Sequence, residues 1–323
     1  MTDYEFEKYS TTPENLKKTL ELYGVAIIPS VLNQEESSNI FSGIWDFLEY
    51  ISQNWSIPIN RNNQDSWKGF YDLYPLHSML LKNWYIGHSQ VCWDVRQNIK
   101  ILNIFSHLWN CKPQELLSSF DGFSFHLPPE ITNRGWFKNN LWLHVDQSFT
   151  DNKFKCVQSW VTAFDINEGD ATLAFLEKSH LFHEDFGREF NIKDKSNWYK
   201  LNDDEKQFFI NNDCSLKKIK CPKGSLVLWD SRTIHCGIEP LKNRKNPNFR
   251  AIIYLCYLPR SFATSKQLEK KIKAFETLRT TSHWPCNIKL NSINPRTYGK
   301  DIPNIAIIPY PQLSEIGYKL AGL

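Results

Sequence analysis

The sequence has no long apolar run and no strong excess of charge of one sign. No uninterrupted apolar stretch approaches the roughly 18–20 residues that a membrane-spanning helix needs. The net charge of +3 is too small to create a strong field that would attract nucleic acid or a membrane surface. The composition therefore gives no signal for a membrane or nucleic-acid partner.

Cysteine pairs at the spacing of a metal finger or a redox motif are also absent. The eight cysteines are irregularly spaced, and none forms a Cys-x-x-Cys. The first ten residues are acidic and polar and do not resemble a signal peptide. We therefore expect reduced thiols and an intracellular, cytoplasmic protein.

Helical periodicity is present in the first third of the chain and again near its end. Apolar residues at helical spacing predict helices over 13–23, 34–52, 90–109 and 264–279. The second of these opens with a capping-box pattern, Asn33 followed by Glu36. Residues 53–85 lack clear periodicity and are expected to form a long loop with short elements. The proline-rich tail over 280–323 is expected to be irregular.

Short strand-like runs dominate from about Ser118 onward, separated by Gly, Pro, Asn and Asp. These runs cover 118–126, 141–146, 157–164, 171–176, 216–219, 225–230, 234–238 and 249–258. Such a series is typical of an all-β sandwich or barrel. Residues 181–213 interrupt the series and are expected to be a partly helical insertion.

The stretch LWLHVDQSF, residues 141–149, places His144 and Asp146 two positions apart among apolar neighbours. In a strand, residues i and i+2 point to the same face, so both side chains can reach one point. A polar or charged group in an apolar strand needs a partner, because unpaired burial costs roughly 2–7 kcal/mol or more. An imidazole and a carboxylate are two of the three ligands of the 2-His-1-carboxylate triad that holds non-heme Fe(II).

The third ligand must come from elsewhere, and the best candidate is His235 in GSLVLWDSRTIHCG, residues 224–237. After a basic, Asn-rich loop, Arg250 opens the otherwise apolar strand that follows. A guanidinium in such a place needs an anion, and its planar fork suits a carboxylate.

Taken together, these motifs resemble the phytanoyl-CoA dioxygenase family of Fe(II)/2-oxoglutarate-dependent oxygenases. The residues that carry the resemblance are His144-x-Asp146, then GSLVLWDSR-x-x-His235, then Arg250. Residues 168–180, EGDATLAFLEKSH, resemble the family segment that usually ends in Gly-Ser-His, with Lys178 in place of the glycine. The opening Tyr-Gly-Val at 23–25 agrees as well, so that the similarity spans roughly residues 14–258.

The resemblance implies a mainly β fold, a double-stranded β-helix (jelly roll, cupin-like) with flanking N-terminal and inserted helices. It implies that His144, Asp146 and His235 are the catalytic iron ligands. Arg250 would hold the distal carboxylate of the cosubstrate 2-oxoglutarate, and O2 would be the oxidant. Arg244 is a rival for the role of Arg250, because the loop that carries it is longer than is usual in the family.

Several further residues are candidates for a substrate pocket: Trp142, Trp160, Trp229, Arg232, His283 and Trp284. Arg232 could equally form a structural ion pair. The segment around Trp284 could close over the pocket as a lid or strap the barrel from outside. The pair His180-x-x-His183 is more typical of a polar loop than of a second metal site, because no further ligands cluster nearby.

We therefore expect one oxygenase domain over residues 1–323. It would consist of an N-terminal helical layer (1–117), a jelly-roll core (118–260) with the insertion 181–213, and a C-terminal helix and tail (261–323). The expected activity is hydroxylation of an unactivated C–H bond in a small-molecule or acyl substrate, with release of succinate and CO2. Two alternatives stay open: a catalytically silent relative that keeps the fold as a binding protein, and an oxygenase acting on a protein or nucleic acid.

Overall fold

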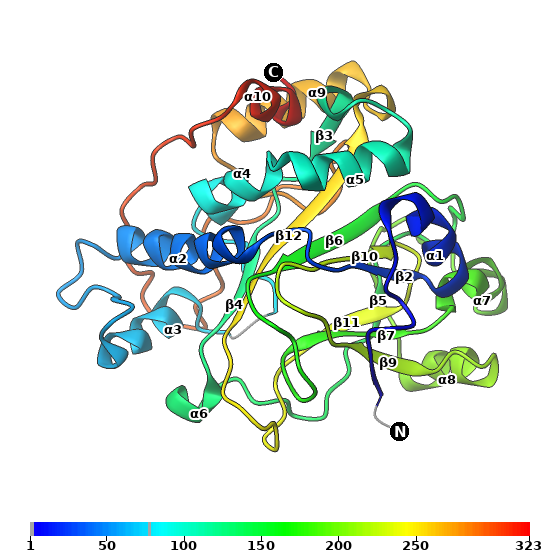
Figure 1. The fold of residues 1–323 in the computed structure, drawn as a ribbon, viewed down its shortest axis with the longest axis horizontal. Coiled ribbons are helices and arrows are strands. Elements are labelled where there is room, and N and C mark those ends of the chain that lie inside the picture. Colours follow the sequence, from blue (N-terminus) through cyan, green and yellow to red (C-terminus); the bar gives the residue numbers. More distant parts are fainter. Residues whose placement is uncertain (1–2, 77–78) are drawn as a thin grey trace.

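Two mostly antiparallel sheets form the centre of the computed structural model, which describes residues 3–76 and 79–323 (Figure 1). The first sheet has the strand order β1-β9-β7-β11-β5-β8, and the second has the order β2-β10-β6-β12-β3, with β4 also paired to β12. The strands are β1 (Tyr4–Glu5), β2 (Val25–Ile28), β3 (Leu116–Ser118), β4 (Phe123–His126), β5 (His144–Val145), β6 (Val157–Thr162), β7 (Thr172–Leu176), β8 (Tyr199–Lys200), β9 (Leu216–Ile219), β10 (Leu226–Asp230), β11 (His235–Ile238) and β12 (Arg250–Pro259).

Helices contain more of the described residues than strands do. They are α1 (Leu16–Tyr23), α2 (Gln34–Ile51), α3 (Phe70–Leu73), α4 (Gln90–Arg96), α5 (Ile99–Trp109), α6 (Pro129–Thr132), α7 (His183–Glu189), α8 (Asp203–Asn211), α9 (Ser265–Glu276) and α10 (Glu315–Ala321). The expectation of a mainly β protein therefore describes the centre only, and the chain as a whole mixes helices and strands. No helix in the described ranges is long and apolar enough to cross a membrane.

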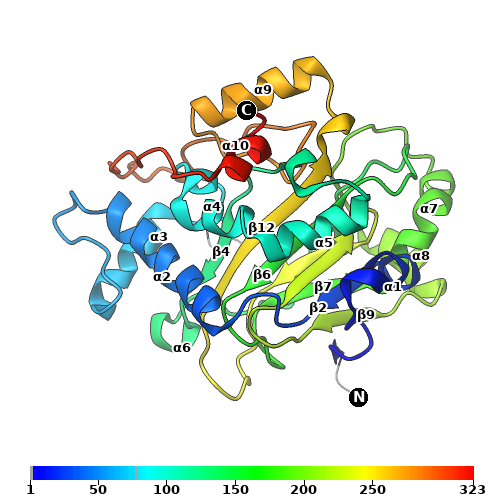
Figure 2. The same ribbon diagram turned by 45° about the horizontal axis from the view of Figure 1, so that its top comes forward.

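The N-terminal helices α2, α4 and α5 cover the outer face of the second sheet (Figures 1 and 2). The predicted capping box is present, since the Asn33 side chain accepts from Glu36 N and Glu36 accepts from Asn33 N. The predicted single helix over 90–109 is two helices, α4 and α5. Asn98 begins the second one by accepting a hydrogen bond from Lys100 N, so a polar cap interrupts the apolar periodicity.

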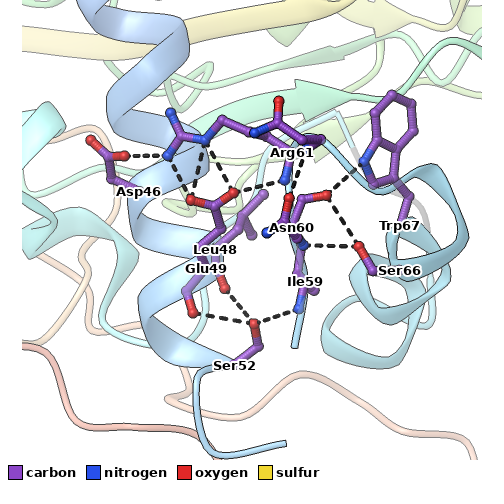
Figure 3. A network of polar contacts seen from close by, with 10 residues as sticks. Asp46, Leu48, Glu49, Ser52, Ile59, Asn60, Arg61, Ser66 and Trp67 are labelled. Atoms are coloured by element: carbon purple, nitrogen blue, oxygen red, sulfur yellow. Dashed lines mark hydrogen bonds and ion pairs between the residues drawn. The ribbon is translucent and has the colours of Figure 1, made fainter. Parts of the chain in front are cut away.

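The loop after α2 is fixed to that helix by a polar network (Figure 3). Arg61 forms ion pairs with Asp46 and Glu49, and the Ser52 hydroxyl accepts from Ile59 N at 3.0 Å. The loop then carries Trp67 to within 5.7 Å of the Phe249 ring, measured between ring centroids. The network therefore supports the residue immediately before Arg250.

The predicted strand over 118–126 is interrupted. β3 pairs with β12 up to Ser118↔Tyr257, and β4 resumes the pairing with Phe123↔Ile253. Four residues, 119–122, thus face three residues, 254–256, so that the strand contains a bulge with one extra residue. One extra residue has no composition signal of its own, so the sequence analysis did not reveal the bulge.

The C-terminal tail crosses the helical layer before it ends in α10, a helix that the sequence analysis missed (Figures 1 and 2). Backbone hydrogen bonds join it to distant segments, with Trp84 N donating to Ile293 O at 2.7 Å and Ala306 N donating to Ile51 O at 2.9 Å. This part of the tail is therefore a strap over the N-terminal helices.

Candidate metal centre and anion site

His144, Asp146 and His235 meet at the junction of two short antiparallel strands of the first sheet. His144 on β5 and His235 on β11 are direct cross-strand partners, and Asp146 follows β5 by one residue. The Nε2 atoms of His144 and His235 lie 3.5 and 3.4 Å from Asp146 Oδ2. Three potential ligand atoms, one from each residue, lie within 4.8 Å of one another. The three side chains could hold a metal ion.

Both imidazoles are oriented by backbone carbonyls. His144 Nδ1 lies 3.3 Å from Trp142 O, and His235 Nδ1 lies 2.9 Å from Thr233 O. A carbonyl oxygen can only accept, so each Nδ1 carries the proton and each Nε2 keeps its lone pair toward Asp146. This outer support is the arrangement expected around metal-binding histidines.

The charge state of the cluster also suits a divalent cation. Burial would raise the pKa of Asp146, but the neighbouring His144 and His283 hold it well below its usual range. Burial lowers the pKa of His235, which keeps that ring neutral. Gln158 on β6 donates to Asp146 Oδ2 at 3.1 Å. The cluster thus presents one carboxylate and two imidazole nitrogens, a set that fits Fe(II) and related metals.

Aromatic rings and a buried hydroxyl hold the ligand strands in place. The Trp142 ring stacks on His144 with centroids 4.6 Å apart, and Trp229 lies 5.3 Å from the His235 ring. Ser179 accepts a hydrogen bond from Ile234 N, next to His235, at 2.8 Å. Lys178, where the resembling family usually has glycine, adopts a left-handed backbone with φ of 66°. The segment ending at His180 is therefore a structural support for β11.

Arg250 is a buried cation at the start of β12, on the second sheet. Its Nε donates to Ser124 Oγ at 3.0 Å, and its Nη1 donates to Ala171 O at 2.7 Å. The guanidinium also lies 5.7 Å from the Trp160 ring centroid. Among the described residues, no carboxylate lies within ion-pair distance of it. The hydrogen-bond acceptors of Arg250 are thus neutral, and burial lowers its pKa, a shift that Tyr254, Cys221 and the more distant Glu239 oppose. A desolvated guanidinium of this kind suits an added anion.

Arg244 is already paired. It contacts Glu130 with Nη2 to Oε2 at 2.6 Å, and it contacts Asp170 with Nη1 to Oδ1 at 3.0 Å. Two carboxylates therefore balance its charge and tie the loop after β11 to α6 and to the segment before β7. This contrast favours Arg250 over Arg244 as the anion-binding residue.

The remaining candidate residues for a substrate pocket lie in three different environments. Arg232 forms an ion pair with Asp230 at 2.6 Å and also donates to Asn152 O, which accounts for its charge locally. Trp160 is fully buried between the sheets, beside Arg250. Trp284 packs in a buried cluster with Cys156 and Cys256, and the neighbouring His283 has an enclosed Nε2 with no hydrogen-bond partner among the described residues.

His180 and His183 do not form a second metal group with other described residues. His180 Nε2 contacts Glu21 O at 3.0 Å, while His183 contacts the Asn152 side chain at 2.7 Å and Gln147 O at 3.2 Å. Each ring is therefore part of the local polar packing.

Two residues beside the triad were missed by the sequence analysis. Gln158 lies opposite Cys256 on the face that carries Trp160, a placement that strand alternation could have indicated. Trp198 comes from the insertion, and its ring lies 6.2 Å from the His144 ring. The insertion also supplies β8, which pairs with the ligand strand through His144↔Lys200, a contact with no local sequence signal.

Comparisons with known proteins agree with this architecture. No family model matches the sequence. "Ava biosynthesis cluster protein O" of Aspergillus versicolor is 29% identical over 208 residues, which is 62% of this chain and 64% of that protein. The match therefore covers less than two thirds of the length of that relative.

Solved structures share the fold at low sequence identity. Hypothetical protein JW0805 from Escherichia coli has a TM-score of 0.59 and 14% identity, over 98% of this chain and 85% of that chain. A putative oxidoreductase from Salmonella typhimurium LT2 has a TM-score of 0.59 and 13% identity, over 95% and 82%. GlcNAc Inducible Gene 2 (DUF1479) from Candida albicans has a TM-score of 0.57 and 13% identity, over 84% and 68%. At this identity the three likenesses show a common fold and nothing finer.

Proposed function

We propose that the chain is an Fe(II)- and 2-oxoglutarate-dependent dioxygenase that hydroxylates an unactivated C–H bond of a small-molecule or acyl substrate. The observation that carries the proposal is the combination of two complementary sites. One is a buried His-Asp-His cluster whose Nε2 atoms face the Asp146 carboxylate and could bind a metal, and the other is a buried arginine that forms no ion pair with the described residues. A 2-oxo diacid has a chelating end for the first and a carboxylate for the second.

His144, Asp146 and His235 would hold the iron, and the carbonyls of Trp142 and Thr233 would keep the imidazoles in the correct tautomer. Bound Fe(II) supplies open coordination positions for the 2-oxo acid and O2, so that cosubstrate decarboxylation can be coupled to substrate oxidation. Gln158 would fix the Asp146 carboxylate by donating to the oxygen nearest both imidazoles.

Arg250 would bind the distal carboxylate of 2-oxoglutarate. Ser124 and Ala171 accept from Nε and Nη1, which holds the guanidinium plane in one orientation before the anion arrives. The rings of Trp160, Trp229 and Trp142 would exclude water from the space near both sites.

A carboxylate at position 146 favours hydroxylation over halogenation. Its oxygen would occupy a ligand position on a bound metal, and its negative charge would oppose the binding of chloride there. We further propose that residues 1–323 act as one domain whose two sheets form a jelly roll, because the triad and Arg250 come from different sheets.

The name of the Aspergillus versicolor relative identifies it as a biosynthesis cluster protein, which supports a small-molecule substrate. The description of the Salmonella structure as a putative oxidoreductase agrees with redox chemistry. Because the curated match is partial, these descriptions support the substrate class only as part of the proposal.

The test is a succinate-release assay with purified protein, Fe(II), ascorbate and 2-oxoglutarate, run over lipid, amino-acid, peptide and nucleic-acid substrates. We expect O2-dependent succinate formation that one small-molecule or acyl class stimulates and that the Asp146→Ala variant abolishes. A protein that binds neither metal nor 2-oxoglutarate would contradict the proposed function.

A further inference from the structure

The bulge at residues 119–122 lies beside the part of β12 that runs between the two sites. Ser119 N donates to Cys256 O at 2.8 Å, and Tyr254 N donates to Gly122 O at 3.2 Å. Cys256 is the cross-strand partner of Gln158, which donates to Asp146, whereas Tyr254 lies four positions after Arg250. The bulge therefore sits alongside the path from the metal ligands to the arginine.

Two segments that are distant in sequence hold this bulge. The buried guanidinium of Arg96 donates to the backbone oxygens of Asp121 and Gly87. From the tail, Thr281 N donates to Phe120 O at 2.9 Å, and Thr281 Oγ1 accepts from Phe120 N at 3.1 Å. Bulges commonly re-aim a side chain next to an active site, and this one is fixed on both sides.

The side chain that the bulge presents is Asp121, which is only 4% exposed. In the described ranges, its carboxyl has one hydrogen bond, from Gly122 N at 2.9 Å, and no ion pair. Burial, reinforced by Asp146, raises the pKa of Asp121 to about 7, although Arg96 and Lys82 oppose the shift. The bulge residues on either side of Asp121, Ser119 and Gly122, are hydrogen-bonded to Cys256 and Tyr254.

A second underused polar group comes from the same assembly. His283 follows Thr281 by two residues, and its enclosed Nε2 has no hydrogen-bond partner among the described residues. Burial lowers the pKa of His283, and His235 and His144 reinforce that shift while Asp146 opposes it. The adjacent Trp284 packs in one cluster with Cys256, the cross-strand partner of Gln158. Two buried polar groups with unused hydrogen-bonding capacity thus lie near the Cys256–Gln158 pair that leads to Asp146. Burying such a group in a complex without a hydrogen bond would cost about 1–3 kcal/mol.

We propose that Asp121 contacts the substrate, accepting a hydrogen bond from an amine or hydroxyl group of the small molecule, with His283 as a second polar contact. This inference rests on the proposed function and narrows its substrate class to molecules that carry an N–H or O–H donor near the reacting carbon. Trp284, whose ring centroid lies 5.6 Å from that of His283, suits an apolar or aromatic skeleton beside that donor.

The test uses three probes with one skeleton: benzylamine, benzyl alcohol and benzyl methyl ether, of which only the first two can donate. Protein loaded with Co(II) and 2-oxoglutarate under argon is titrated with each probe. Paramagnetic relaxation of the probe protons in NMR reports binding close to the metal. The variants are Asp121→Asn, which keeps the shape, Asp121→Ala, and Asp94→Asn as a control that removes a carboxylate from the exposed side of α4.

In the unmodified protein we expect the amine and the alcohol to bind at least tenfold more tightly than the ether. Asp121→Ala should remove that preference, Asp121→Asn should weaken the amine most, and Asp94→Asn should change nothing. Three equal affinities in the unmodified protein, including no binding of any probe, would overturn the proposal. Retention of the preference in Asp121→Ala would overturn it as well.

Metal and 2-oxoglutarate binding are measured first in every variant, with a thermal melt to confirm folding. If the unmodified protein bound neither metal nor 2-oxoglutarate, the proposed function itself would be refuted. Weaker 2-oxoglutarate binding in Asp121→Asn, with unchanged probe binding, would assign Asp121 to the cosubstrate and reject the substrate contact.

Discussion

The triad and the region around Arg250 are both buried and polar, but they balance charge in opposite ways. At the triad, one carboxylate oxygen faces the Nε2 atoms of two imidazoles, at 3.5 and 3.4 Å. Around Arg250, a guanidinium contacts a hydroxyl, a carbonyl and an aromatic ring. Among the described residues, no lysine or arginine forms an ion pair with the first region and no carboxylate forms one with the second, so one diacid chelated to a metal would complete both.

The backbone differs between the two regions as well. The ligands lie on strands of two and four residues, whereas Arg250 opens the ten-residue strand β12. Short strands need external support, which comes here from β8, Ser179 and the stacked Trp142. A long central strand fixes its side chains by itself. The comparison indicates that the metal region is the more sensitive to changes in its surroundings.

The largest effect is expected from His144→Ala or His235→Ala. Either change removes a ligand from a three-ligand set, and metal affinity should fall by roughly 100-fold or more, since even outer-sphere changes cost about 10–100-fold. Metal content after dialysis measures this. The exposed His107 on α5 is the control, and His107→Ala should retain full metal content. Normal metal content in both ligand variants would refute the triad.

Arg250→Ala should weaken 2-oxoglutarate binding by about 2–5 kcal/mol and leave metal binding intact, because it removes a charge-assisted contact and no ligand. Arg244→Ala should lower the stability of the fold and leave 2-oxoglutarate binding unchanged. It leaves Glu130 and the buried Asp170 without their cation, so unfolding should become easier while 2-oxoglutarate affinity stays unchanged. Calorimetric titration and chemical denaturation separate the two effects. An exchange of the two phenotypes would mean that Arg244 is the anion site.

Gln158→Leu should lower metal affinity by about tenfold, less than loss of a ligand. The amide orients Asp146 and does not itself bind the metal, so its removal acts through the carboxylate. The comparison of metal dissociation constants for Gln158→Leu and His235→Ala tests this order. A Gln158→Leu protein as metal-deficient as His235→Ala would show that Asp146 cannot be positioned without the amide.

The smallest expected effect is on the pH dependence of the free energy of unfolding, and it concerns Lys271, a buried lysine outside both regions. Burial lowers the pKa of Lys271 to about 7 from its usual 10.5. Between these values the unfolded chain binds more protons than the folded one, so the free energy of unfolding should rise as pH increases from 7 toward 10. Urea denaturation at pH 7, 8 and 9 should show this slope, and Lys271→Met should flatten it. If the slope is the same in both proteins, Lys271 does not titrate as the structure indicates.

Some of these features could be predicted from the sequence because they depend on neighbours along the chain. The capping box of α2 and the shared face of His144 and Asp146 are of this kind. The choice between Arg244 and Arg250 could not be made, because the partners of Arg244 lie 114 and 74 positions away.

Long-range packing also hid the bulge and the tail. Asp121 attracted no attention because one extra residue in a strand has no composition signal. His283 is brought near the bulge because Thr281 is hydrogen-bonded to Phe120, 161 positions earlier. Sequence periodicity describes single elements, whereas these contacts depend on how the elements assemble.

The central claim is that the triad and Arg250 bind opposite ends of one cosubstrate. It is tested most directly by comparing 2-oxoglutarate with 2-oxovalerate, which keeps the chelating end and lacks the distal carboxylate. Affinities are measured anaerobically with metal-loaded protein, before and after Arg250→Ala. We predict that 2-oxoglutarate binds at least 30-fold more tightly before the substitution, as expected for about 2 kcal/mol, and that the two acids bind equally after it. An undiminished preference for 2-oxoglutarate in Arg250→Ala would contradict the account.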